Sequence, residues 1–155
     1  MKDQTCCFTG HRAIPPSERE ALKKRLEAEI VNLIHQGVRY FGAGGARGFD
    51  TMAAQAVLRL REEYPDIKLI LVLPCKTQAG GWSELDKAIY KRILIQADKV
   101  VYTSEREERG CMLKRNRHLV DSSAVCVCYL ASLKGGTAYT VDYAQENGLR
   151  IINLA

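Results

Sequence analysis

The chain has 155 residues, the size of one ordinary domain, and its 46% hydrophobic and 26% charged residues exclude a disordered, collagen-like or coiled-coil protein. A net charge of +5 and a pI near 8.9 favour an anionic ligand. Dedicated nucleic-acid-binding domains typically have a pI above about 9, and the pI of this chain is lower, so nucleic acid is not expected as a partner. The longest apolar run, residues 67–74, is too short to span a bilayer.

Strand and helix signals alternate along the whole chain. Strands are predicted at residues 5–9, 38–41, 67–73, 99–103, 124–130 and 150–154. Helices are predicted between them, with Ser17, Asp50, Ser83 and Thr137 at four of the starts and a short helix at residues 112–121. This alternation predicts an α/β fold: one Rossmann-like domain over residues 1–155, with a doubly wound, mostly parallel sheet flanked by helices. The doubly wound strand order would be 3-2-1-4-5-6.

No signal peptide precedes the first strand, and no membrane segment is present, so we expect a cytoplasmic bacterial protein. The cysteines favour the same compartment. Cys6, Cys7, Cys126 and Cys128 lie in apolar strand-like runs, where a free cysteine behaves as a small hydrophobic residue. No pair or cluster has zinc-ligand spacing, so we predict buried, reduced thiols and no metal site.

Glycine and polar residues follow four of the strands, at the sheet edge where α/β proteins bind ligands. These candidate ligand-binding and phosphate-binding residues are Thr9, Gly10, His11 and Arg12 after the first strand; Gly44, Gly45, Arg47, Gly48 and Asp50 after the second; Arg115, Asn116 and Arg117 after the fourth; and Gly135, Gly136 and Thr137 after the fifth.

Both glycine-rich loops lead directly into helices, where backbone N–H groups and the helix dipole attract phosphate. The alternative is that the glycines only permit tight turns. Asp50 has two compatible roles, as a helix cap and as a partner of a ligand hydroxyl. A usable GxGxxG or GxxxxGK[ST] motif is absent, so neither a dinucleotide cofactor nor a P-loop triphosphatase is indicated, and no cofactor is expected.

The segments TGHR at 9–12, GGARGFD at 44–50, RNR at 115–117 and GGT at 135–137 together resemble the SLOG superfamily. This superfamily unites the DNA-processing protein DprA with the LOG phosphoribohydrolases. The resemblance is greatest to its small bacterial YpsA-like group, because CCFTGHR at 6–12 is characteristic of that group. It implies a Rossmann-like domain, an arginine at position 115 that holds phosphate, and a homodimer.

One position departs from the LOG pattern. Thr140 stands where the LOG enzymes have their catalytic glutamate, and hydrolysis of an N-glycosidic bond needs a carboxylate near the developing oxocarbenium ion. The resemblance therefore implies a sensor or regulatory module that binds a small nucleotide or ADP-ribose-like ligand, with no catalytic residue assigned. The alternatives are a nucleoside 5′-monophosphate phosphoribohydrolase that uses another acid, such as Asp50 or Asp142, and DprA-like binding of single-stranded DNA.

Overall fold

The computed structural model describes residues 1–155 and contains one six-stranded sheet in which every neighbouring pair of strands is parallel. The strands are β1 Thr5–Gly10, β2 Tyr40–Ala43, β3 Lys68–Leu73, β4 Lys99–Tyr102, β5 Val125–Tyr129 and β6 Arg150–Asn153. All six predicted strands are present, with ends displaced by at most two residues. The α/β fold class predicted from the sequence is confirmed.

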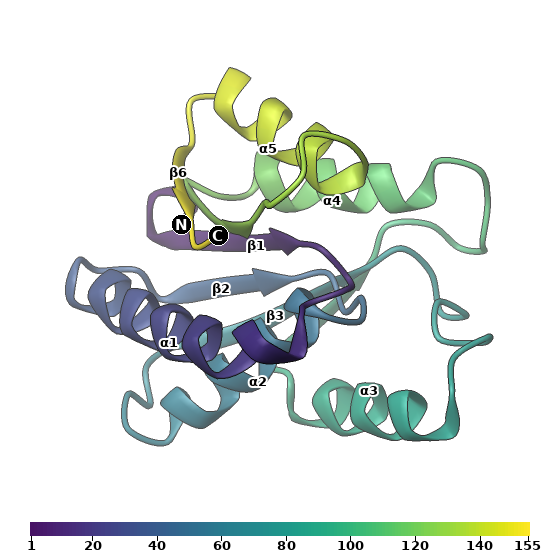
Figure 1. Cartoon of the computed structure of the whole chain (residues 1–155), viewed down its shortest axis with the longest axis horizontal. Helices are drawn as coiled ribbons and strands as arrows, with labels where there is room; N and C mark the ends of the chain where they lie inside the picture. Colours follow the sequence, from purple (N-terminus) through teal and green to yellow (C-terminus); the bar gives the residue numbers. More distant parts are fainter.

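Helices cover both faces of the sheet (Figure 1). On one face lie α1 Arg19–His35, α2 Phe49–Arg61 and α3 Glu84–Gln96, and on the other lie α4 Cys111–Asp121 and α5 Gly136–Glu146. Two short 3-10 helices, η1 Lys2–Gln4 and η2 Pro16–Glu18, flank β1. Ser83 caps α3 as predicted, because its Oγ accepts the N–H of Asp86 at 3.1 Å. Ser17 does not cap α1: it lies inside η2, and α1 begins only at Arg19.

The strand order is β4-β3-β2-β1-β5-β6, which corrects the order 3-2-1-4-5-6. The predicted order placed β4 beside β1, whereas β4 extends the sheet beyond β3 and β5 occupies the position next to β1. The reason is the position of α3, which lies on the same face of the sheet as α1 and α2. The connection from β3 to β4 therefore continues in the same direction as the two connections before it, and β4 is added outside β3. The strand order therefore reverses between β1 and β5, and a ligand crevice is expected there.

Apolar side chains pack on both faces of the sheet. The larger cluster lies between the sheet and helices α1–α3, and the smaller cluster lies under α4 and α5. All six cysteines are buried and carry free thiols, and the predicted burial of the strand cysteines is confirmed. None of the helices combines the length and the apolar character that crossing a membrane requires.

Candidate functional site

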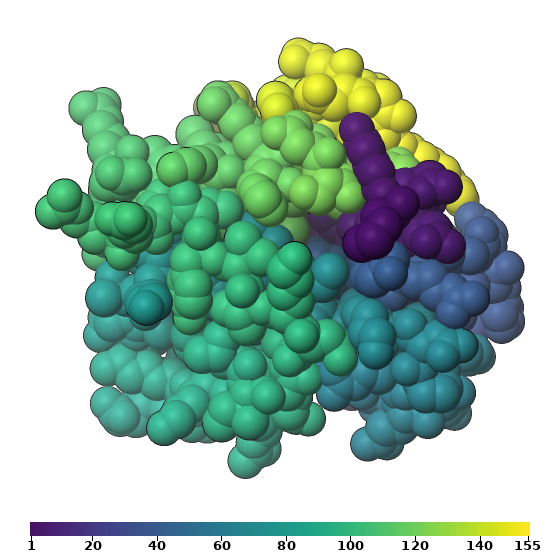
Figure 2. All heavy atoms as spheres, turned by 180° about the vertical axis from the view of Figure 1, so that it is seen from behind, coloured from purple at the N-terminus to yellow at the C-terminus, as the bar shows by residue number.

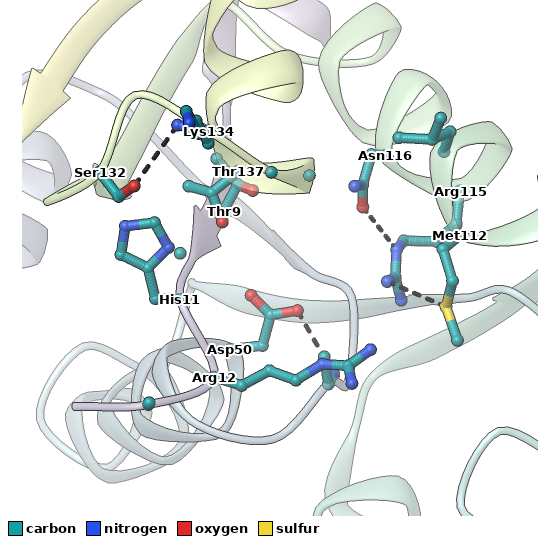
Figure 3. A pocket seen from close by; sticks show the side chains of 16 residues that line it. Thr9, His11, Arg12, Asp50, Met112, Arg115, Asn116, Ser132, Lys134 and Thr137 are labelled. Carbon is teal, nitrogen blue, oxygen red and sulfur yellow. Dashed lines mark hydrogen bonds between the residues drawn. The ribbon is translucent and has the colours of Figure 1, made fainter.

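A cavity of about 590 Å³ opens at the carboxyl ends of β1 and β5 (Figure 3). Its walls come from the end of β1, the start of α2, one side of α4 and the loop that leads into α5. Ten of the fifteen residues predicted for the site line it: Thr9, Gly10, His11, Arg12, Asp50, Arg115, Asn116, Gly135, Gly136 and Thr137. The topology thus brings together segments that are more than a hundred residues apart in the sequence.

His11 joins the two loops that border the crevice. Its Nε2 accepts the backbone N–H of Ala131 at 2.9 Å, and its ring lies edge-on to Tyr129 with centroids 5.8 Å apart. His11 fixes the loop after β1 against the loop after β5.

Asp50 is the one carboxylate that lines the cavity. It is not the N-cap of α2, because α2 begins at Phe49 with Gly48 as its N-cap; Asp50 lies in the first turn and accepts the N–H of Ala46 at 3.3 Å. Burial raises the pKa of Asp50 to about 6, although the Arg115 guanidinium, the Ala46 N–H and Arg12 each act to lower it. A carboxyl group that changes charge near neutral pH is thus placed inside the crevice.

Arg115 lies on α4 and is only 4% exposed. Its guanidinium donates to the carbonyl of Gly44, to Gln78 Oε1 at 3.3 Å and to Asn116 Oδ1 at 2.7 Å. Burial lowers the pKa of Arg115, and the charge of Asp50 opposes this change. Because most of its donors are satisfied within the chain, Arg115 connects α4 to the loop after β2 and contributes charge to the wall of the cavity.

The other two residues of the RNR segment point in different directions, since successive residues on a helix are about 100° apart. Asn116 lines the cavity and donates to Thr140 Oγ1 at 3.0 Å; Thr140 in turn donates to the carbonyl of Gly136 at 2.8 Å. Thr140 is thus buried and helps to position the turn before α5. Arg117 is exposed and lies over the rings of Tyr139 and Tyr143, away from the cavity.

The loop after β2 supports the site from behind. Gly44, Gly45, Arg47 and Gly48 do not line the cavity, whereas Ala46 does. A Cβ on Gly44 would lie 2.8 Å from the Arg115 guanidinium and 2.9 Å from the Asp50 carboxylate, so this glycine makes room for both charged groups. Gly48, with φ of +80°, packs directly against the backbone of Arg12. Arg47 lies over the ring of Trp82 at 5.0 Å.

The loop after β5 presents its backbone to the cavity. Gly135, with φ of +99°, is the N-cap of α5, and no side chain caps this helix. The N–H groups of the first turn, at Gly136 and Thr137, have no partner within the helix. Gly136 and Thr137 line the cavity, at the positive end of the helix dipole.

Two exposed cations complete the rim, Arg12 from the loop after β1 and Lys134 from the loop before α5. The charged group of neither residue makes a hydrogen bond or ion pair within the chain. Lys134 was missed in the sequence, although a cation directly before a glycine pair that opens a helix is a usable signal. The other unpredicted lining residues are Ala13, Ala46, Met112, Leu113 and Ser132. Their side chains carry no charge, and nothing in their spacing marked them.

Comparison with known proteins gives matches over most of the chain. The model of the YspA SLOG family, YpsA, matches residues 7–151. UPF0398 proteins of Bacillus thuringiensis (strain Al Hakam) and Bacillus cereus (strain AH187) are each 30% identical over 132 residues, which is 83% of this chain and 72% of theirs.

Two solved structures of DNA processing protein A have the same fold. The protein from Streptococcus pneumoniae matches with a TM-score of 0.69 at 18% identity, and the protein from Helicobacter pylori with 0.68 at 19%. Each match covers 98% of this chain but only 50% and 65%, respectively, of the solved chains. The Helicobacter structure describes a unique mode of single-stranded DNA binding by that protein. This finding contradicts the expectation that nucleic acid is not a partner, because a pI just below 9 does not exclude a fold that binds single-stranded DNA in another protein.

Proposed function

The chain belongs to the YspA SLOG family, and from that premise we propose that it binds a phosphorylated nucleotide, or a derivative such as ADP-ribose, in the cavity between β1 and β5. The observation that carries the proposal is the uncapped N-terminus of α5, which faces the cavity beside two cations with no partner in the chain, Arg12 and Lys134. Backbone N–H groups at a helix start and free cations are the groups that bind phosphate.

Phosphate would lie at the start of α5. The N–H groups of Gly136 and Thr137 and the hydroxyl of Thr137 would donate to its oxygens. Arg12 would reach it from the opposite side of the crevice, where its planar guanidinium suits bidentate contact with phosphate. Arg115, held by Gly44 and Gln78, would supply charge from behind without changing its hydrogen bonds.

The sugar would lie toward Asp50, since this carboxylate is the one strong anionic acceptor in the cavity wall. Asp50 already accepts one N–H, from Ala46, and has further acceptor capacity for a ribose hydroxyl. A volume of about 590 Å³ falls within the range of about 300–1,000 Å³ that is usual for small-molecule sites.

We propose binding rather than hydrolysis of the glycosidic bond. The position of the LOG glutamate holds Thr140, whose hydroxyl bonds to Gly136 and Asn116 and does not line the cavity. A ligand-binding role without turnover agrees with a sensor or regulatory module.

Single-stranded DNA is the second candidate, favoured by the fold shared with the Helicobacter protein. The phosphate of a strand could use the same groups, Arg12, Lys134 and the start of α5. The two candidates differ in what the rest of the ligand must contact.

Calorimetry with AMP, ADP-ribose and a single-stranded oligo(dT) of about 12 nucleotides, within the usual site sizes of about 4–16, separates the candidates. We expect AMP or ADP-ribose to bind, and Arg12→Ala to weaken binding at least tenfold, since a charge-assisted hydrogen bond is worth about 1.5–3 kcal/mol. Arg117→Ala, which removes an equal charge outside the cavity, is the matched control and should leave the affinity unchanged. Binding of the oligonucleotide but neither nucleotide would favour the second candidate, and no binding of any of the three would refute both.

A further inference from the structure

The face of the sheet that carries α4 and α5 is incompletely covered. Three helices cover the opposite face, but here only two do, and α4 lies over β1 and β3 while α5 lies over β1, β5 and β6. At the other edge, alternate residues of β3 and β4 face the open side, and among them Ile70 and Val101 are only half-buried. Parallel strands are usually covered on both faces, so this exposed apolar surface is unusual.

A groove runs along this open part of the sheet. It consists of two adjoining hollows, of about 330 and 620 Å³, which meet at Val101 and His118. Its floor is made by the branched aliphatic side chains of Ile70, Val72 and Val101, and one wall is the outer side of α4. Figure 2 shows this side of the molecule, where the N-terminal residues (purple) lie beside α4 (green) at one end of the groove. We call it the β3–β4 groove.

The rim of the β3–β4 groove is basic. Four permanent cations line it, all of them exposed: Lys2, Lys99, Lys114 and Arg117. The one acid among the lining residues is Asp121, and its Oδ1 already accepts the hydroxyl of Tyr143 at 2.7 Å. Lys2, Lys99 and Lys114 have no ion-pair partner in the chain. An aliphatic floor between unpaired cations suits an occupant that is both apolar and acidic.

We propose that the β3–β4 groove binds an acidic segment of a partner protein, with aliphatic side chains on the floor and carboxylates against Lys99 and Lys114. A second copy of the chain fits less well, because a two-fold contact would bring the basic rim against itself. A nucleic-acid strand also fits less well, since bases stack on aromatic rings and this floor is aliphatic. Of the two tyrosines at the ends of the groove, Tyr102 is already contacted by Lys76.

Helix α4 lies between this surface and the nucleotide cavity, and Leu113 is the one residue that lines both. Met112, Arg115 and Asn116 face the cavity, while Lys114, Arg117 and His118 face the groove. The proposal therefore does not depend on the nucleotide ligand, and either can fail without the other.

Selection from a library of random short peptides on the immobilised protein tests the proposal. We expect the recovered peptides to combine Asp or Glu with Leu, Ile or Val, and one synthetic representative to bind in solution. The double variant Lys99→Glu, Lys114→Glu should bind that peptide at least tenfold more weakly. Lys24→Glu, at an exposed position of α1 on the opposite face, is the matched control and should not change the affinity. Circular dichroism checks that the variants are folded.

Amide NMR shifts locate the bound peptide independently of the variants. The expected result is a set of shifts confined to β3, β4 and the outer side of α4. Each of four results would overturn the proposal: no peptide is enriched, the consensus lacks acidic residues, the double variant binds the peptide equally well, or the shifts are confined to another face. If oligo(dT) binds at the same amides more tightly than the peptide does, the proposal is overturned in favour of nucleic acid. If self-association of the protein shifts those amides, it is overturned in favour of a second copy of the chain.

Discussion

Replacing Asp50 by asparagine is expected to make the protein more stable at neutral pH. Burial raises the pKa of this carboxyl from its ordinary 3.8 to about 6, despite the neighbouring Arg115 and Arg12. The native state therefore holds the proton more tightly than the unfolded chain does, and the stability of the wild-type protein falls as pH rises from about 4 to about 6. An asparagine at this position keeps an acceptor for the Ala46 N–H but has no charge to bury.

The size of the effect follows from the pKa. A rise from 3.8 to about 6 corresponds to about 3 kcal/mol above pH 6, because one pKa unit is worth about 1.4 kcal/mol. We expect Asp50→Asn to gain up to this amount in the free energy of unfolding at about pH 7 and almost nothing near pH 4, where the wild-type carboxyl is also neutral. AMP should bind the variant at least tenfold more weakly, since a charged acceptor for the ribose is lost. Such a conflict between stability and function is common at binding sites.

Urea unfolding of both proteins between about pH 4 and pH 8 measures the difference. Asp142→Asn is the control, because Asp142 is exposed and forms no ion pair, and its effect should stay within about 0.5 kcal/mol at every pH. The reasoning is refuted if Asp50→Asn is no more stable than the wild type at pH 7, or if its gain in free energy of unfolding does not grow with pH. Either result would show that Arg115 and Arg12 already compensate the buried carboxylate fully.

Three further outcomes are expected. Arg115→Ala should lower the free energy of unfolding by about 3 kcal/mol in urea titrations, because it leaves the carbonyl of Gly44 and the amide of Gln78 without their buried donor; a loss below about 1 kcal/mol would contradict this. Gly48→Ala should destabilise the protein by more than about 1 kcal/mol in thermal unfolding, since φ is +80° and a Cβ would overlap the backbone of Arg12, and an unchanged melting temperature would refute that reading. Incubation with AMP, followed by chromatography for free adenine, should show no turnover, because position 140, where the LOG resemblance places a carboxylate, holds a threonine whose hydroxyl bonds to Gly136. Release of adenine at the usual enzymatic rate of about 10 per second would indicate that another acid acts in its place.

The sequence was sufficient for the elements and for much of the site. Apolar runs such as residues 67–73 and helix starts such as Ser83 are local signals, so the strands and the α3 cap could be predicted without tertiary information. The glycine and polar residues after the strands predicted the edge of the sheet at which the cavity lies, because the carboxyl ends of parallel strands meet on one side of a sheet.

Strand order could not be predicted from local pattern. Which face α3 covers decides whether β4 lies beside β1 or beyond β3, and this depends on packing between helices and the sheet. The same holds for the direction of the RNR side chains: three neighbouring residues on one helix face the interior, the cavity wall and solvent. Sequence spacing placed both arginines near the ligand, but the rotation of α4 directs only one of them inward.

The sequence by itself therefore determined which segments reach the edge of the sheet where the cavity lies, since that depends on strand polarity and turn chemistry within each βα unit. The tertiary structure decided which groups remain free to bind there. Arg115 is engaged by Gly44 and Gln78, whereas Arg12 and Lys134 have no partner in the chain. These differences arise from contacts between residues far apart in the sequence, which form only when the sheet and its helices pack together.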